Sequence, residues 1–221
     1  MRAVCLWTAG FVDRSCREPD AARRTEAEER VALLTPVVKA WCTELAQDIA
    51  RDGVQVHGGM GFIEETGAAQ HLRDAQILSI YEGTNGIQAL DLVGRKLAIA
   101  KGAVPWRLLD ELRAELSGVD PVVATGLAPA LAALERTTRH LQSADDATRA
   151  AAATPYLRLF GWTLGGCLLA RGARSAAGDP RGAAWPGLAR FYVGQLLPPA
   201  VALAAAIEAP PDALDPALLV A

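Results

Sequence analysis

Apolar residues in the first half of the chain recur with the spacing of a helix. The clearest stripe lies within 31–50 and consists of Leu34, Val38, Trp41, Leu45 and Ile49. Its steps of four, three, four and four place all five side chains on one helix face. Strand-like alternation is hard to find anywhere in the chain. The pattern therefore predicts an all-α protein.

Other predicted elements of this half surround glycine-rich junctions. The charged run 17–30 is typical of an exposed connection followed by a helix start. Four glycines in 53–62 predict a loop or a distorted helix end. Helices are expected over 68–80 and 87–100, with a turn between them. We expect these elements to form one helical bundle within residues 1–101.

The amino-acid composition changes near residues 101–106, and Ala, Leu and Arg predominate after this point. Asp120 followed by Pro121 predicts a helix start. The apolar stretch 156–172 predicts a buried helix, and 178–187 a loop. A helix over 188–208 should break at Pro198-Pro199. We interpret 102–221 as a second helical bundle that serves packing or an interface.

Composition narrows the functional classes. Lys and Arg total 22 against 25 Asp and Glu, a net charge of -3, which argues against a nucleic-acid partner. Four cysteines without metal or redox spacing are interpreted as buried thiols of a reducing compartment, and the three histidines form no ligand pair. Residues 159–170 are apolar but too short for the ~20 residues of a membrane span. We expect a soluble, cytoplasmic protein without a metal or membrane partner.

Candidate chemistry gathers in IYEGTNGIQ, residues 80–88, where Glu82 stands at a junction between two predicted helices. Gly83 and Gly86 allow a ligand to approach the backbone closely, and a helix beginning near Thr84 presents free N–H groups. Asn85 with Gln88 has the spacing of a capping box, although Thr84 is an alternative cap. An acid desolvated by a ligand could act as a base. On spacing alone, a capped interhelical turn is the simpler interpretation.

The segment 55–97 changes that balance. It contains Gln-x-x-Gly-Gly-x-Gly-Phe at 55–62, Arg-Asp at 73–74 and Tyr-Glu-Gly-Thr at 81–84. In order and spacing these motifs resemble the C-terminal signature of the acyl-CoA dehydrogenases. The residues of this segment are most like those of the branch that includes the 3-methylmercaptopropionyl-CoA dehydrogenases. Members of that branch carry an extra C-terminal helical domain. Residues 102–221 would be that domain.

The resemblance implies roles for particular residues. Glu82 matches the base that removes the α-proton of an acyl-CoA while the β-hydride passes to FAD, giving a 2-enoyl-CoA. Tyr81 would line the acyl pocket or belong to the core, and Arg73-Asp74 would be structural. The residues that match FAD-contacting positions are Gln55, Gly58, Gly59, Thr84 and Gly86. Many relatives have glutamine where Gly86 stands, so a backbone contact is expected there.

The resemblance also implies partners. Members of the family carry an N-terminal helical domain and a middle β-domain that hold most of the flavin and the CoA, and neither lies in these residues. We therefore expect homo-oligomerisation or a separate chain with the flavin-binding β-domain, and an electron-transfer flavoprotein as acceptor. The alternative is an inactive helical remnant or interaction module.

Overall fold

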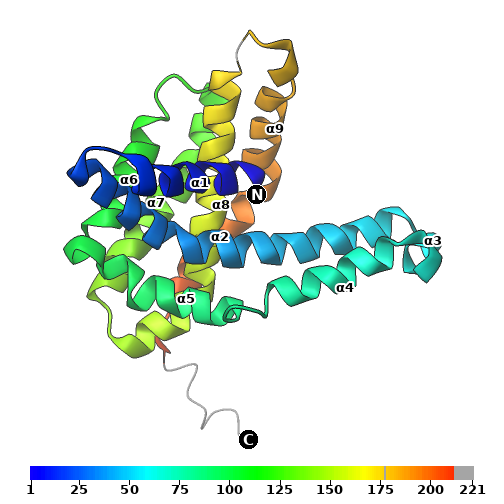
Figure 1. Ribbon diagram of the computed structural model, residues 1–221, viewed down its shortest axis with the longest axis horizontal. Coiled ribbons are helices and arrows are strands. Elements are labelled where there is room, and N and C mark those ends of the chain that lie inside the picture. Colours follow the sequence, from blue (N-terminus) through cyan, green and yellow to red (C-terminus); the bar gives the residue numbers. More distant parts are fainter. Residues whose placement is uncertain (177, 212–221) are drawn as a thin grey trace, which may run out of the picture.

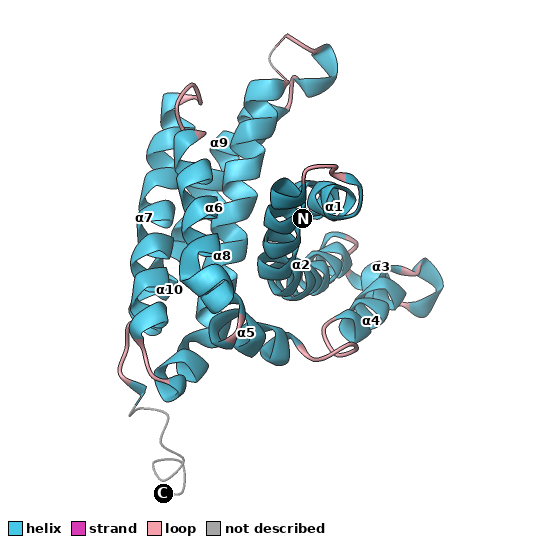
Figure 2. Ribbon diagram, turned by 60° about the vertical axis from the view of Figure 1, so that its left-hand side comes forward, coloured by secondary structure: helices cyan, strands magenta, loops and turns pink. Residues whose placement is uncertain are grey.

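The computed structural model describes residues 1–176 and 178–211, and every regular element within them is helical (Figures 1 and 2). The predicted all-α class is confirmed. The α-helices are α1 (Arg2–Arg17), α2 (Ala21–Val56), α3 (Gly59–Phe62), α4 (Ala68–Leu78), α5 (Asn85–Gly94), α6 (Ala103–Ala114), α7 (Pro121–Ser143), α8 (Asp146–Ser175), α9 (Trp185–Phe191) and α10 (Pro198–Ile207). Short 3-10 segments η1 (Glu64–Thr66), η2 (Lys96–Gly102) and η3 (Pro180–Gly182) and a π-helical turn η4 (Tyr192–Leu196) connect them.

Helix α2 spans 36 residues and links the body of the protein to a projecting arm. It begins at Asp20, whose side chain accepts a hydrogen bond from the Arg23 N–H at 2.9 Å. Its first part packs against α1, α5 and α8. Its last part runs beside α4, with α3 at the far end (Figure 1). We call residues 49–78, which form this projection, the arm.

The body is organised around α8, which packs against α2, α5, α7, α9 and α10. Where α2 meets α8, the buried indole of Trp41 lies on two glycines of α8. A Cβ at Gly161 would come within 2.3 Å of Trp41 Cγ, and one at Gly165 within 2.8 Å of Trp41 Cη2. Such distances are far below van der Waals contact, so the crossing requires glycine at both positions.

Aromatic packing extends this contact toward the C-terminal helices. The ring of Trp162 lies edge-on to Trp41, with centroids 5.6 Å apart, and 5.6 Å from Tyr192 on its other side. The Tyr192 hydroxyl donates to the Trp162 carbonyl at 2.7 Å. Burial raises the pKa of Tyr192 well above its ordinary value, so the phenol stays a neutral donor. The group fixes η4 against α8.

The predicted helix boundaries of the second half are partly confirmed. Asp120 caps α7 through the N–H of Val122 at 2.9 Å, as the Asp-Pro pair predicted. The helical segments on either side of Pro198 are bent by 42°, at the expected break. The helix predicted over 156–172 is longer, because Asp145 caps it at the Thr148 N–H and Pro155 is accommodated in its interior.

One boundary prediction of the first half was wrong. The helix expected over 87–100 ends at Gly94, after which Ala100 and Lys101 adopt positive φ angles of 50° and 57°. The apolar stripe misled because Leu97 is buried although it follows the helix. The glycine-rich stretch 53–62 agrees with the expected distorted helix end, because α2 ends there at Val56 and α3 forms one further turn after Gly58, which has a φ of 60°.

The interpretation of all four cysteines as buried thiols was also wrong. Cys167 is buried, whereas Cys5 and Cys16 are exposed on α1 and Cys42 is half-buried on α2. Burial raises the pKa of Cys167 to about 12. Spacing showed only that no local motif was present, and it carried no information on which face of α1 the two thiols occupy.

One contiguous cluster of buried side chains runs from Val4 in α1 to Ile207 in α10. Helix α5 of the first half packs extensively on α8 of the second. The proposed boundary at residues 101 and 102 stays a prediction, part of whose second unit lies beyond the described residues. Any two units divided there share their core.

Across the described ranges, no single helix is both long and apolar enough to cross a bilayer. The bent pair formed by Pro180–Leu196 and Pro198–Ile207 meets that test only jointly, by length and composition.

The Trp41 contact predicts opposite effects of one substitution at two glycines. Gly161→Ala should lower the free energy of unfolding by about 1–3 kcal/mol, because the new methyl group overpacks against the indole. Gly10→Ala should raise it by about 0.5–1 kcal/mol, since Gly10 is exposed within α1 and nothing lies within 4 Å of an added Cβ. Urea unfolding measures both. Equal effects at the two sites would contradict the crossing.

Candidate functional site

The turn that holds Glu82 has an unusual backbone. Helix α4 ends at Leu78 and α5 begins at Asn85. Between them Glu82 has φ 55° and Gly83 has φ 86°, so two successive residues adopt the left-handed region. A side chain with a Cβ pays a conformational cost of about 1 kcal/mol there. The Glu82 carboxylate is exposed and has no hydrogen-bond or ion-pair partner among the described residues.

The start of α5 resolves the choice between two caps. Thr84 is the N-cap, and its Oγ1 accepts from the Ile87 N–H at 3.4 Å. Asn85 is the first helical residue, and its N–H donates to the Ser79 carbonyl at 3.1 Å. The N–H of Gly86 has no acceptor among the described residues and remains available at a helix N-terminus.

A polar stripe on α2, formed by Lys39, Thr43 and Gln47, anchors this turn through hydrogen bonds. Lys39 Nζ donates to the Gly83 carbonyl at 2.8 Å and to Asn85 Oδ1 at 3.0 Å. The Asn85 amide donates in turn to the Ala40 carbonyl at 3.1 Å, and its side chain exchanges a bond with Thr43 Oγ1. One turn further along, the Gln47 amide donates to Ser79 Oγ at 2.7 Å. The stripe fixes both ends of the turn while the Glu82 side chain stays free.

Sequence reasoning missed this stripe. A signal was present, because Lys39, Thr43 and Gln47 follow one another at intervals of four and therefore share one face of α2. Beside the apolar stripe of the same helix, this polar row resembled an ordinary solvated face. Only the fold shows that a turn more than 30 residues later covers it.

Tyr81 is half exposed, with 48% of its surface accessible, so it does not belong to the core. The Lys39 ammonium lies 6.0 Å from the centre of its ring, at the outer limit of a cation–π contact. The ring therefore lies at the surface of the chain.

Three of the predicted cofactor-binding residues lie at the other end of α4. Gln55 is in the last turn of α2 and exposed, and its carbonyl accepts from the Gly58 N–H at 3.0 Å. Gly58 has φ 60° and caps α3, in which Gly59 is the first residue. Gly61 is also required here, because a Cβ would lie 2.3 Å from the Val54 carbonyl oxygen.

The predicted site residues thus form two groups, one at each end of α4. This helix has 11 residues and a length of about 16 Å. The end of α2 and the start of α3, which carry Gln55, Gly58 and Gly59, lie at the tip of the arm (Figure 1). The turn between α4 and α5 and the start of α5, which carry Tyr81, Glu82, Thr84 and Gly86, lie at its root. The structure does not bring the two groups together within one chain.

Arg73 and Asp74 make contacts of a structural kind. The Arg73 guanidinium donates to the Glu64 carboxylate at 2.7 Å and ties α4 to η1. Asp74 accepts from the Gln70 amide at 2.6 Å, one turn earlier on α4. Both pairs stiffen the arm near its tip, as the bridging interpretation of this motif expected.

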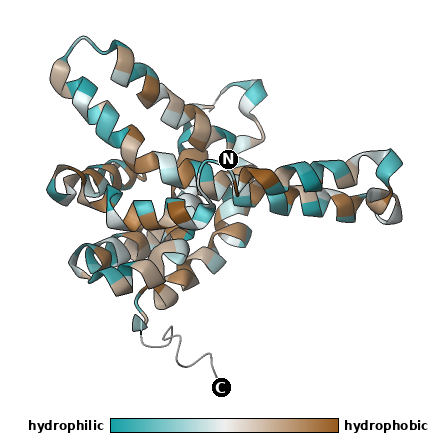
Figure 3. Ribbon diagram, turned by 60° about the horizontal axis from the view of Figure 1, so that its bottom comes forward, coloured by the Kyte–Doolittle hydropathy of each residue, from teal (hydrophilic) through white to brown (hydrophobic). Residues whose placement is uncertain are grey.

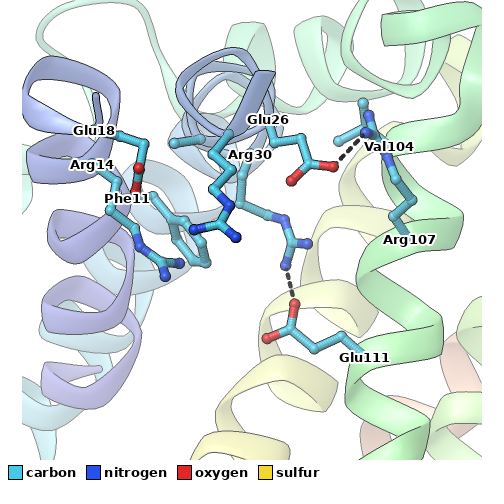
Figure 4. Close-up of a pocket in the computed structure, with 10 residues that line it drawn as sticks. Phe11, Arg14, Glu18, Glu26, Arg30, Val104, Arg107 and Glu111 are labelled. Atoms are coloured by element: carbon cyan, nitrogen blue, oxygen red, sulfur yellow. Dashed lines mark hydrogen bonds and ion pairs between the residues drawn. The ribbon is translucent and has the colours of Figure 1, made fainter. Parts of the chain in front are cut away.

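A cleft of about 450 Å³ lies between the α1–α2 elbow and α6, away from all predicted site residues (Figure 4). Its charged side chains largely compensate one another. Arg30 donates to Glu111 at 2.7 Å, and Arg107 approaches Glu26 at 3.6 Å and also pairs with Glu29. We assign this cleft a structural role, since its ion pairs join α2 to α6.

Exposed apolar side chains concentrate on the arm and its root. The ribbon coloured by hydropathy shows apolar positions (brown) interspersed with polar ones along the projecting arm (Figure 3). Val56 and Phe62 are the extreme cases, with 86% and 83% of their surfaces accessible. Exposed apolar patches mark sites that bind another protein, a membrane or a ligand. The members of this group, which we call the arm patch, are Ile49, Val56, Met60, Phe62, Ile63, Ile77, Ile80, Tyr81, Ile87 and Leu90.

Comparison with known families assigns both halves of the chain. Residues 19–97 match the family described as acyl-CoA dehydrogenase, C-terminal domain. Residues 108–215 match the family described as acetyl-CoA dehydrogenase C-terminal like. The chain therefore carries the C-terminal domains of the acyl-CoA dehydrogenase family, as the motifs at 55–62, 73–74 and 81–84 indicated.

Individual proteins that resemble this chain belong to the same family. The chain is 44% identical over 191 residues to 3-methylmercaptopropionyl-CoA dehydrogenase of Ruegeria pomeroyi, a match that covers 80% of this chain and 32% of that protein. A butyryl-CoA dehydrogenase of Syntrophomonas wolfei is 36% identical over 46% of this chain and 17% of its own length. The mitochondrial short-chain specific acyl-CoA dehydrogenase of Homo sapiens is 43% identical over 28% and 15%. The chain thus spans at most about a third of the length of these relatives.

The stripe on α2 predicts that Asn85→Ala loosens the turn. Removing the amide deletes its bonds to Ala40 and Thr43 and leaves Lys39 one acceptor fewer. Unfolding free energy should fall by about 1–2 kcal/mol, and amide hydrogen exchange should accelerate over 79–88. Gln76→Ala, at an exposed position of α4, is the matched control and should leave both quantities nearly unchanged. Unchanged exchange over 79–88 in Asn85→Ala would contradict the anchoring role.

Proposed function

We propose that this chain is the C-terminal portion of an FAD-dependent acyl-CoA dehydrogenase that converts an acyl-CoA to a 2-enoyl-CoA. The observation that carries the proposal is Glu82, held in the left-handed region by an anchored turn inside the family motif. A free carboxylate on a fixed backbone is what a positioned base requires. Its strain is explained if the turn must present that carboxylate to a substrate.

Glu82 takes the α-proton. The thioester carbonyl acidifies the α-carbon of an acyl-CoA, and a carboxylate within hydrogen-bond reach can accept its proton. In the isolated chain the carboxylate is exposed to water. The proposal therefore requires a second surface that covers the turn, excludes water and strengthens the charge interactions at the reacting carbon. Tyr81, beside Glu82 and half exposed, would line the acyl pocket.

The candidate residues of this chain could contact one edge of a flavin cofactor, but they do not enclose it. Thr84 and the free N–H of Gly86 lie at the N-terminus of α5, which suits a polar ring edge or a phosphate. Gln55, with Gly58 and Gly59 beside it, presents an exposed amide and a bare backbone at the tip of the arm. FAD, when bound, supplies the acceptor for the hydride that leaves the β-carbon.

The separation of the two groups also bears on the assembly. Because they lie at opposite ends of α4, the tip and root would contact different cofactors or different sides of one. We propose that the arm patch is covered in the complete enzyme, by a second copy or by a chain that carries the flavin-binding β-domain. An electron-transfer flavoprotein would then reoxidise the flavin. The alternative is a helical interaction module that uses the same patch without catalysis.

Glu82→Gln tests the base in a completed enzyme. We suggest a chimera in which this chain replaces the segment that it matches in the Ruegeria pomeroyi enzyme. Flavin reduction by a saturated acyl-CoA, measured by rapid mixing, should slow by at least about 100-fold, because the amide keeps the shape but accepts no proton. Flavin content should stay unchanged. Glu82→Asp should keep partial activity, since the carboxylate is retained one methylene further back.

Glu65→Gln, also exposed but near the tip of the arm, is the matched control and should reduce its flavin at the parent rate. If Glu82→Gln does so too, Glu82 is not the base. A flavin-loaded parent chimera that is not reduced by any acyl-CoA would favour the interaction-module alternative.

The isolated chain should bind FAD weakly and should self-associate through the arm patch. Phe62→Asp places a charge in the arm patch, at the tip of the arm, and should raise the dissociation constant of self-association by at least about tenfold. Leu188→Asp, at a 52% exposed position on α9, should leave it unchanged. Sedimentation velocity over a concentration series measures both. A monomeric parent at high concentration would exclude this use of the patch.

A further inference from the structure

The exposed and half-buried thiols of Cys5 and Cys42 form a pair that neither the family motifs nor the proposed chemistry uses. Their sulfurs are 3.7 Å apart, although the residues are 37 positions apart in sequence and lie on different helices. A disulfide has its sulfurs about 2.05 Å apart, so each would need to move by only about 0.8 Å. Side-chain rotation supplies such a movement without displacing a helix.

Packing on both sides holds the two residues at this separation. Val4, next to Cys5, is fully buried, and Trp41, next to Cys42, is 2% exposed and rests on the glycines of α8. Helix α1 packs extensively against α2. The approach of the sulfurs is therefore a property of the core and not of a mobile surface.

We propose that Cys5 and Cys42 are a modification site at which a peroxide-class oxidant forms a reversible disulfide that ties α1 to α2. The same turn of α2 carries Thr43, which contacts Asn85 beneath the candidate base. Oxidation would therefore add a covalent tie to the helix that positions the turn.

The two thiols differ in a way that orders the reaction. Cys5 is exposed and meets the oxidant first. The Cys5 thiol gives up its proton and the thiolate attacks the peroxide, so that an S–O bond forms and the O–O bond breaks. The hydroxide that leaves takes the proton released by Cys5 and becomes the first water. The Cys42 sulfur then attacks the Cys5 sulfur, an S–S bond forms and the S–O bond breaks. The hydroxide leaves as water with the Cys42 proton, so two thiols are oxidised and one peroxide is reduced to two waters.

The second step is the slower one. Burial, followed by the charge of the nearby Cys5 thiolate, raises the pKa of Cys42 to about 12. Such a thiol is mostly protonated and is a poor nucleophile, so this step depends on an electrophile that is held at contact distance. The sulfenic acid of Cys5 is uncharged, which removes the repulsion, and it stands at that distance.

Cys16 provides a control within the same helix. It is exposed like Cys5 and eleven residues further along α1, a rise of about 16 Å. No disulfide spans such a separation, since its Cα atoms must lie within about 7 Å. Accessibility alone would oxidise both residues, whereas the proposed site joins Cys5 to Cys42 and leaves Cys16 without an intramolecular partner.

The test uses the full chain, hydrogen peroxide and non-reducing peptide mapping. Trypsin separates the four cysteines into peptides 3–14, 15–17, 40–51 and 159–171. We expect peptide 3–14 linked to 40–51, with two hydrogens lost and the link reversed by dithiothreitol. Dimedone, which traps sulfenic acids, should label Cys5 at least about tenfold more in Cys42→Ser than in the parent, because the resolving thiol is missing.

Cys16→Ser should leave the link unchanged and show that α1 remains folded after a similar substitution. The oxidised parent should also unfold at a temperature roughly 5–10 °C higher than the reduced parent, because the link closes a long loop in the unfolded chain. Cys5→Ser should show no such rise. A Cys5 that accumulates as sulfenic or sulfinic acid in the parent, with Cys42 still free, would overturn the proposal, as would a linked chain with an unchanged unfolding temperature. Both readouts are independent of catalysis and of the role proposed for Glu82.

Discussion

The crossing of α2 over α8 is the contact on which the rest of the structure depends. Trp41 can lie against α8 only because Gly161 and Gly165, one turn apart, have no side chains where its indole packs. This contact sets the distance between α2 and α8 and the rotation of α2 about its own axis. Because Lys39 and Thr43 flank Trp41 on the same helix, their positions above the core follow from it. The support of the candidate turn is therefore set by a packing contact that carries no chemistry itself.

This dependence explains why the second half of the chain matters to the first. The segment that matches the acyl-CoA dehydrogenase C-terminal domain contains Trp41 and the turn, and the segment that matches the second family contains Gly161 and Gly165. Helix α8 also packs along α5, whose N-terminus bears Thr84. The additional helices thus brace two of the elements that position Glu82, in a core shared by both halves.

The turn and the arm are exposed for reasons that complement each other. Bonds from α2 fix the backbone around Glu82, yet nothing among the described residues covers its carboxylate. The neighbouring apolar side chains of the arm patch are equally uncovered. The strained backbone of Glu82 and the exposed apolar residues of the arm patch would each carry a free-energy cost without a return if no partner covered them. Together they are what one face of a composite site requires, since the partner surface would bury both.

The sequence by itself determined the helical class, the apolar stripe on α2, the capping Asp120 and the motif that contains Glu82. These are local properties, set by spacing of three and four residues and by side chains that bond to nearby backbone. It could not reveal the end of α5 at Gly94, because Leu97 continues the apolar pattern without continuing the helix. Only the tertiary structure decided what lies against the polar face of α2 and which thiols meet. Those relations join residues tens of positions apart, and packing against α8 sets them.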